Sequence, residues 1–137
     1  MSISMVTSTR SQDTFVRAVV VIAGLSALLT GLALVFAPEW FFNNVGYFPP
    51  FNRHYAGDLG MFQIPIGIGL LAAVRDPVRH RLLIGVATVG NLLHLFNHLY
   101  DDLGSGDVAH LLKDTAPLLL LAVLMLAAYY ILMRKTR

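Results

Sequence analysis

The chain contains no cysteine. Disulfide bonds, thiolate metal ligands and cysteine nucleophiles are therefore excluded. The only glutamate is Glu39, which disfavours a di-iron centre of the ferritin kind, because such centres need several glutamates. No serine lies in a recognisable nucleophile motif, so covalent acyl chemistry is not expected.

Charged residues are also scarce. They make up 13% of the chain, against 56% hydrophobic residues, whereas an average soluble domain is roughly one quarter charged. The net charge of +2 is too small to indicate a nucleic-acid partner. The apolar residues fall in long runs, which are typical of membrane spans. Residues 1–137 are therefore predicted to form a single integral membrane domain.

Four apolar runs are long enough to cross a bilayer as α-helices, at about residues 18–36, 55–74, 82–99 and 115–133. Each approaches the roughly 20 residues that span about 30 Å of hydrocarbon. The length of the first run and the lack of a clear small-residue cleavage site favour a retained span over a cleaved signal peptide. The predicted fold is an all-α, four-helix transmembrane bundle with up-down-up-down connectivity, and its first partner is the lipid bilayer.

The basic residues predict the orientation. Eight of the ten precede the first span, join the second to the third, or follow the fourth: Arg10, Arg17, Arg75, Arg79, Arg81, Arg134, Lys135 and Arg137. Because lysine and arginine gather in cytoplasmic segments, both termini are predicted to be cytoplasmic and the protein to be multi-pass in a bacterial inner membrane. The outer loop at 37–53 contains Glu39 and then three aromatic residues, which favours a short interfacial helix.

Polar residues within membrane spans are costly and mark functional sites. His54 and Asp58 lie four residues apart at the outer end of the second span, and His94 and His98 do so in the third. Each pair therefore shares one side of its helix. The short loop between these spans predicts that the two helices pack as antiparallel neighbours, which would bring both pairs to one depth.

The third span also carries a polar stripe, predicted from residue steps of three, four and three: Asn91, His94, His98 and Asp101. Together with His54 and Asp58 of the second span, this stripe allows three interpretations. In the first, a transition metal, zinc or copper and less favourably haem iron, is bound by His54, Asp58, His94 and His98. Asn91 and Asn97 would then contact the bound cofactor from outside the ligand set.

The second reading is a metal-free pocket in a membrane enzyme, where Asp58 and His94 act as catalytic acid and base on a lipid-soluble substrate. The third reading is structural, with the polar residues only joining helices by hydrogen bonds. We expect the first reading, in a redox-associated or accessory subunit with its site near the extracytoplasmic face. Its further partners would be other membrane subunits or a second copy of the chain.

The segment Phe51–Gly60, in which Arg53 precedes the small pair Ala56 and Gly57, is followed by the glycine-rich stretch Ile66–Leu70. These residues resemble the DoxX-like proteins, which are small bacterial four-helix membrane proteins. The resemblance covers the first two spans and the span layout. It implies a role beside membrane oxidoreductases, since some members are described as their subunits or partners. The histidines of the third span do not match that pattern, so no functional residue is carried over.

Overall fold

The computed structural model describes residues 3–106 and 108–135. Arg137, one of the basic residues counted above, lies outside them. Every regular element in the described ranges is helical: α1 (Ile3–Phe36), α2 (Pro38–Asn44), α3 (Arg53–Ala73), α4 (Arg81–Ser105), α5 (Val108–His110), the π-helical turn η1 (Leu111–Thr115) and α6 (Ala116–Lys135). The all-α prediction is confirmed for this part of the chain.

Four helical stretches are long and apolar enough to cross a membrane: Arg10–Phe36, Arg53–Ala73, Arg81–Gly104 and Val108–Lys135. They overlap the four predicted spans, although the first begins before its predicted start, and they indicate a multi-pass membrane protein. The third stretch continues past its predicted end, and the fourth begins before its predicted start. Hydropathy placed those limits where the apolar residues stop, but the helices continue through polar residues that bind one another.

Local signals set several helix boundaries. Pro38 lacks a backbone N–H and has a fixed φ, so it suits the first position of α2, where Glu39 follows in the first turn. Helix α2 confirms the predicted short helix. Asn52 caps α3, because its side chain accepts a hydrogen bond from the Tyr55 backbone N–H at 3.1 Å. Helix α4 ends at Gly106, whose φ of 68° is left-handed and favours glycine.

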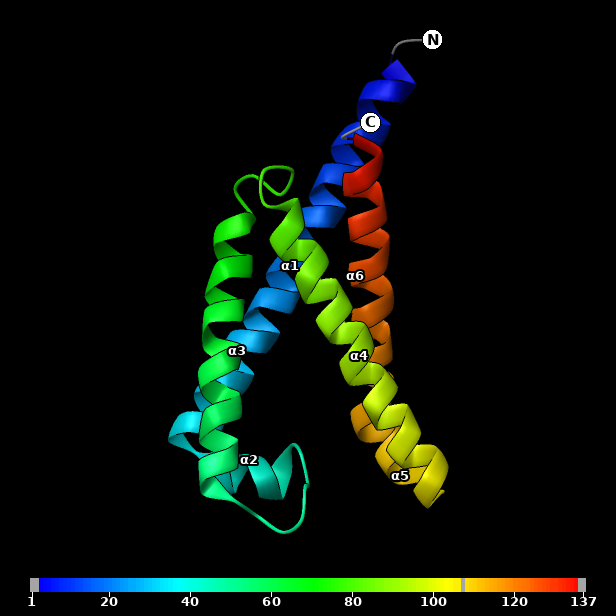
Figure 1. The fold of residues 1–137 in the computed structure, drawn as a ribbon. Helices are drawn as coiled ribbons and strands as arrows, with labels where there is room; N and C mark the ends of the chain where they lie inside the picture. Colours follow the sequence, from blue (N-terminus) through cyan, green and yellow to red (C-terminus); the bar gives the residue numbers. More distant parts are fainter. Residues whose placement is uncertain (1–2, 107, 136–137) are drawn as a thin grey trace.

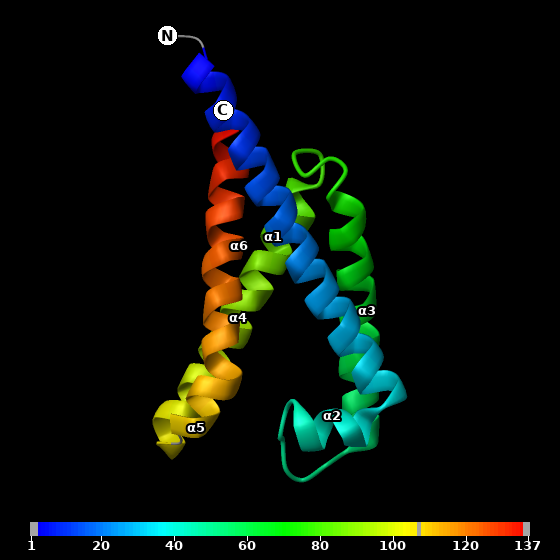
Figure 2. The same cartoon turned by 180° about the vertical axis from the view of Figure 1, so that it is seen from behind.

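The beginning of α1 and the end of α6 lie at the same end of the molecule (Figure 1). Helix α1 packs mainly on α3, and α4 packs mainly on α6, while α1 also crosses α6. Figures 1 and 2 show two helix pairs that meet at the end carrying both termini and spread apart toward the other end. We call the spread end the open end.

The buried core lies where the two pairs meet. It is formed by small and branched side chains from four helices: Val16, Val19, Val20, Ala23, Leu70, Ala73, Ile84, Met125, Ala128 and Leu132. In lipid, such packing and close backbone approach hold helices together, since the hydrophobic effect between helices is absent. The core therefore fixes the relative position of the pairs at one end of the bundle.

Glycines let α1 and α3 approach closely. A Cβ atom added at Gly67 would lie 2.6 Å from the Leu28 backbone nitrogen and 2.8 Å from the Gly24 carbonyl oxygen. One added at Gly60 would lie 2.8 Å from the Gly31 carbonyl oxygen. The contacts are to backbone atoms, which cannot move aside as a flexible side chain can. This pair of helices is consequently the more closely packed of the two.

Helices α3 and α4 differ from the predicted arrangement. They are joined by a short loop, yet they make few contacts with each other. Their distant halves separate, with α3 and α2 on one side of the open end and α4 and α5 on the other (Figures 1 and 2). The short loop allows the two helices to be neighbours, but α1 occupies the packing face of α3, and α6 that of α4.

Candidate functional site

The first predicted pair lies on the opening turns of α3. The His54 Nε2 and Asp58 Oδ2 atoms are 3.4 Å apart, so the two side chains share a helix side as expected. However, 90% of the His54 side chain and 62% of the Asp58 side chain are exposed. An exposed ion pair contributes little to stability, because solvent or headgroups screen it.

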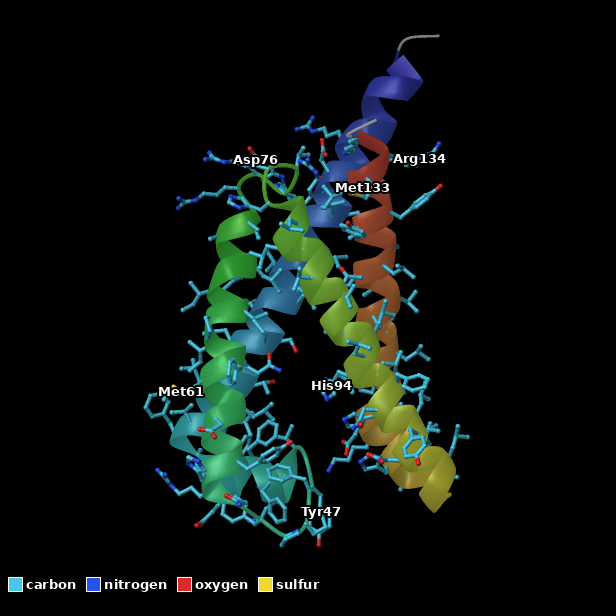
Figure 3. The ribbon with its side chains drawn as sticks, in the orientation of Figure 1. Tyr47, Met61, Asp76, His94, Met133 and Arg134 are labelled. Atoms are coloured by element: carbon cyan, nitrogen blue, oxygen red, sulfur yellow. The ribbon has the colours of Figure 1, made fainter. Side chains whose placement is uncertain are left out.

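The second predicted pair lies on α4. The Nε2 atoms of His94 and His98 are 3.2 Å apart, so one ring donates to the other, and the rings meet edge to face with centroids 4.8 Å apart. His94 is exposed and projects from α4 on the side of α3 (Figure 3). His98 is half-buried, and its Nδ1 atom is buried without a hydrogen-bond partner among the described residues.

The structure does not bring these two pairs together, because α3 and α4 diverge toward the open end. Within residues 3–106 and 108–135, no group of three or more histidine, cysteine, aspartate or glutamate side chains is arranged to hold a metal ion. The predicted metal set therefore receives no support. The predicted acid and base, Asp58 and His94, are likewise not assembled into one site.

Asn91 and Asn97, which were predicted to contact a cofactor, do not join the predicted histidines in a common site. The Asn91 Nδ2 atom donates to the Ala87 carbonyl oxygen of its own helix at 3.3 Å. Such a bond to the preceding turn is common for short polar side chains in helices. Asn97 is exposed on the surface of α4. Neither observation assigns these residues to a ligand.

A different cluster forms at the open end, around Asp102 of α4. Asp102 is only 4% exposed. Its Oδ1 atom lies 2.5 Å from His110 Nδ1, and its Oδ2 atom accepts a hydrogen bond of 2.6 Å from the Thr115 hydroxyl. A buried carboxylate needs such partners, since an unpaired one would be strongly disfavoured in an apolar bundle. The carboxylate thus joins α4 to both α5 and η1.

His110 stands between two carboxylates. Its Nδ1 atom faces Asp102, and its Nε2 atom lies 3.3 Å from Asp114 Oδ2. An imidazolium can donate to both carboxylates at once, because both of its ring nitrogens carry hydrogen. The His110 ring also stacks on His98, with centroids 5.6 Å apart and planes 11° apart. Through His98, the cluster continues to His94 on the exposed side of α4.

The π-helical turn explains why Thr115 reaches Asp102. The Ala116 backbone N–H donates to the Leu111 carbonyl oxygen, which is the wider spacing of a π-helix. That spacing places a residue near the one five positions before it, so Thr115 lies on the same side as His110. Single π-helical turns within α-helices are frequent at functional sites. We call His94, His98, Asp102, His110, Asp114 and Thr115 the histidine–carboxylate cluster.

The sequence analysis did not assign Asp102, His110, Asp114 or Thr115 to a site. The predicted stripe ended on Asp101, which is exposed, whereas Asp102 is buried. A regular step of four residues from His94 through His98 reaches Asp102, so this signal was present in the sequence. No sequence pattern indicated the π-helical turn that adds Thr115.

No family model, curated protein or solved structure matches the chain significantly. The resemblance to DoxX-like proteins stays a prediction.

Proposed function

We propose that this chain is a small integral membrane protein that binds a cationic ligand at the histidine–carboxylate cluster. The ligand is a proton, or a divalent transition metal ion around which the histidines and carboxylates would rearrange, since the described residues do not already form a metal site. The single observation that carries the proposal is the buried carboxylate of Asp102, held by His110 and Thr115 within an apolar bundle. Ionisable groups inside membrane proteins are expensive to bury and are a sign of ion or proton handling.

The charge of the cluster favours a cation over an anion. It contains two carboxylates, Asp102 and Asp114, and imidazole rings that bind protons and metal ions through the same nitrogen atoms. The His94 and His98 Nε2 atoms face each other at 3.2 Å. A tetrahedral zinc ion with Zn–N bonds of about 2.0–2.1 Å would hold two such nitrogens roughly 3.3 Å apart. This spacing suits either a shared proton or a shared metal ion.

In this proposal the open end is extracytoplasmic and both termini are cytoplasmic. The basic residues support that orientation, since they gather at the end opposite the cluster. The protein then acts in the inner membrane as a redox-associated or accessory subunit of a larger complex. Electron transfer in membranes is commonly coupled to proton uptake, and a cluster of titratable groups near one face would serve that coupling.

The test compares two adjacent aspartates in detergent-purified protein. Zinc and copper binding are measured by calorimetry, and carboxyl protonation is followed by infrared spectroscopy across a pH titration. Asp102→Asn is expected to abolish the metal-binding heat or the protonated-carboxyl band. Asp101→Asn is the matched control, since it removes an equal charge from an exposed neighbour. Wild-type protein that shows neither signal, or equal losses in both variants, would contradict the proposal.

A structural subunit is the second candidate, favoured by the close glycine contacts between α1 and α3. On this reading the cluster only joins α4 to α5 and η1. A His98→Gln, Asp102→Asn double variant would then assemble with its membrane partners in normal amounts and leave their activity unchanged. Reduced partner activity with normal assembly would instead favour the ligand site.

A further inference from the structure

The end of the bundle that carries both termini presents an excess of positive charge. Seven described basic residues lie there, in the first half of α1, in the loop between α3 and α4, at the start of α4 and at the end of α6: Arg10, Arg17, Arg75, Arg79, Arg81, Arg134 and Lys135. Asp13 and Asp76 are the acidic residues in the same described segments. Figure 3 shows Asp76 and Arg134 at this end, opposite Tyr47.

The two carboxylates do not neutralise the arginines. Asp13 is paired with Lys135. The Asp76 Oδ1 atom accepts a hydrogen bond of 3.0 Å from the backbone N–H of Arg79, so it shapes the loop. Among the residues that the structure describes, none of the six arginines at this end forms an ion pair with a carboxylate. Their charge is left for a ligand outside the protein.

Arg17 fixes this surface in place. Its Nη1 atom donates to the Val74 carbonyl oxygen and, at 3.1 Å, to that of Arg75, which ties α1 to the end of α3. Carbonyl oxygens satisfy hydrogen bonds but carry no net charge. The Nε and Nη2 hydrogens of Arg17 have no protein partner among the described residues, and neither do the guanidinium groups of Arg75 and Arg79.

We propose that Arg17, Arg75 and Arg79 form a binding surface for the phosphate headgroups of acidic phospholipids. Guanidinium groups bind phosphate oxygens through paired N–H donors, so each of the three can hold the phosphate of one acidic phospholipid. This inference concerns a surface at the opposite end from the histidine–carboxylate cluster, and it does not depend on the function proposed for that cluster.

The position of the arginines favours a lipid over a soluble phosphate. They flank the ends of the apolar stretches, where phospholipid headgroups lie beside a membrane protein. Arg134 lies over the ring of Tyr130, 5.7 Å from its centroid, an arrangement that suits the membrane interface.

The test uses full-length protein in nanodiscs of phosphatidylcholine alone or of phosphatidylcholine mixed with phosphatidylglycerol. Native mass spectrometry measures the bound lipid. Wild-type protein is expected to retain phosphatidylglycerol selectively. The Arg75→Gln, Arg79→Gln double variant is expected to lose about fivefold in affinity for each arginine removed. Both side chains are exposed and have no hydrogen-bond or ion-pair partner among the described residues, so the variant should fold normally.

Arg53→Gln and Lys113→Gln together form the control, because they remove the same charge from the other end of the bundle. The control should retain phosphatidylglycerol as the wild type does. Equal loss in both double variants would show a general charge effect and overturn the proposal. So would equal retention of the two lipids by the wild type. Full displacement of phosphatidylglycerol by inorganic phosphate would assign the surface to free phosphate instead.

Discussion

The Thr115 hydroxyl donates to Asp102 Oδ2 at 2.6 Å, and this bond links residues that are 13 positions apart in the chain. The bond closes the hairpin between α4 and α6 on its inner side. Both residues are buried, so water does not compete for either atom. The relationship makes the stability of the open end depend on a polar contact as well as on apolar packing.

Asp102→Ala should lower the free energy of unfolding by about 1–3 kcal/mol, because it leaves His110 and Thr115 without their buried acceptor. Denaturant titration in detergent micelles, followed by circular dichroism, measures the change. Asp101→Ala alters an exposed side chain and should stay within about 0.5 kcal/mol of wild type. Similar losses for both variants would argue against a buried role for Asp102.

Thr115→Val keeps the shape of the side chain but removes its hydroxyl donor. The expected loss of stability is about 0.6–2 kcal/mol, the range measured for polar bonds between membrane helices. Thr115→Ser retains the donor and should recover most of the loss. If serine and valine destabilise equally, packing of the methyl group would be the important contact, and the bond to Asp102 would not.

Gly67→Ala tests the close approach of α1 and α3. The new Cβ would meet the Leu28 backbone nitrogen at 2.6 Å, so the helices must separate, at an expected cost of about 1–3 kcal/mol. Gly57→Ala on the same helix is the matched control, since nothing lies within 4 Å of its Cβ. That control should be neutral or stabilising by up to about 1 kcal/mol, through higher helix propensity. A neutral Gly67→Ala would contradict the close contact.

The absence of cysteine makes the orientation testable with single introduced thiols. Arg79→Cys and Asp101→Cys place one thiol at each end of the bundle, both at exposed positions. A membrane-impermeant maleimide added to intact cells should label Asp101→Cys and should reach Arg79→Cys only after lysis. The reverse pattern would place both termini outside the cytoplasm.

The four spans could be predicted because each is a continuous apolar run. Hydropathy was less informative at the facing ends of α4 and α6. There His98, Asp102 and His110 end the apolar pattern, but His110 stacks on His98 and pairs with Asp102, and the helices continue. The glycines at positions 60 and 67 pack α1 against α3, as small residues in membrane spans commonly do.

The candidate site was harder to predict, because it depends on which helices are neighbours. The loop between α3 and α4 is short, and this suggested that His54 and Asp58 would approach His94. The contacts that decide the outcome are those of α1 with α3 and of α4 with α6, which no local pattern specifies. The residues that do meet lie on one hairpin, where the step from His98 to Asp102 was the available signal.

Each main helix interface joins two spans that follow one another along the chain, α1 with α3 and α4 with α6. Both helices of the first interface are therefore synthesised before either helix of the second. The histidine–carboxylate cluster draws all its residues from positions 94–115, so its assembly awaits no distant segment. During insertion into the bilayer, His110 and Thr115, which hold the Asp102 carboxylate, both arrive with the last span.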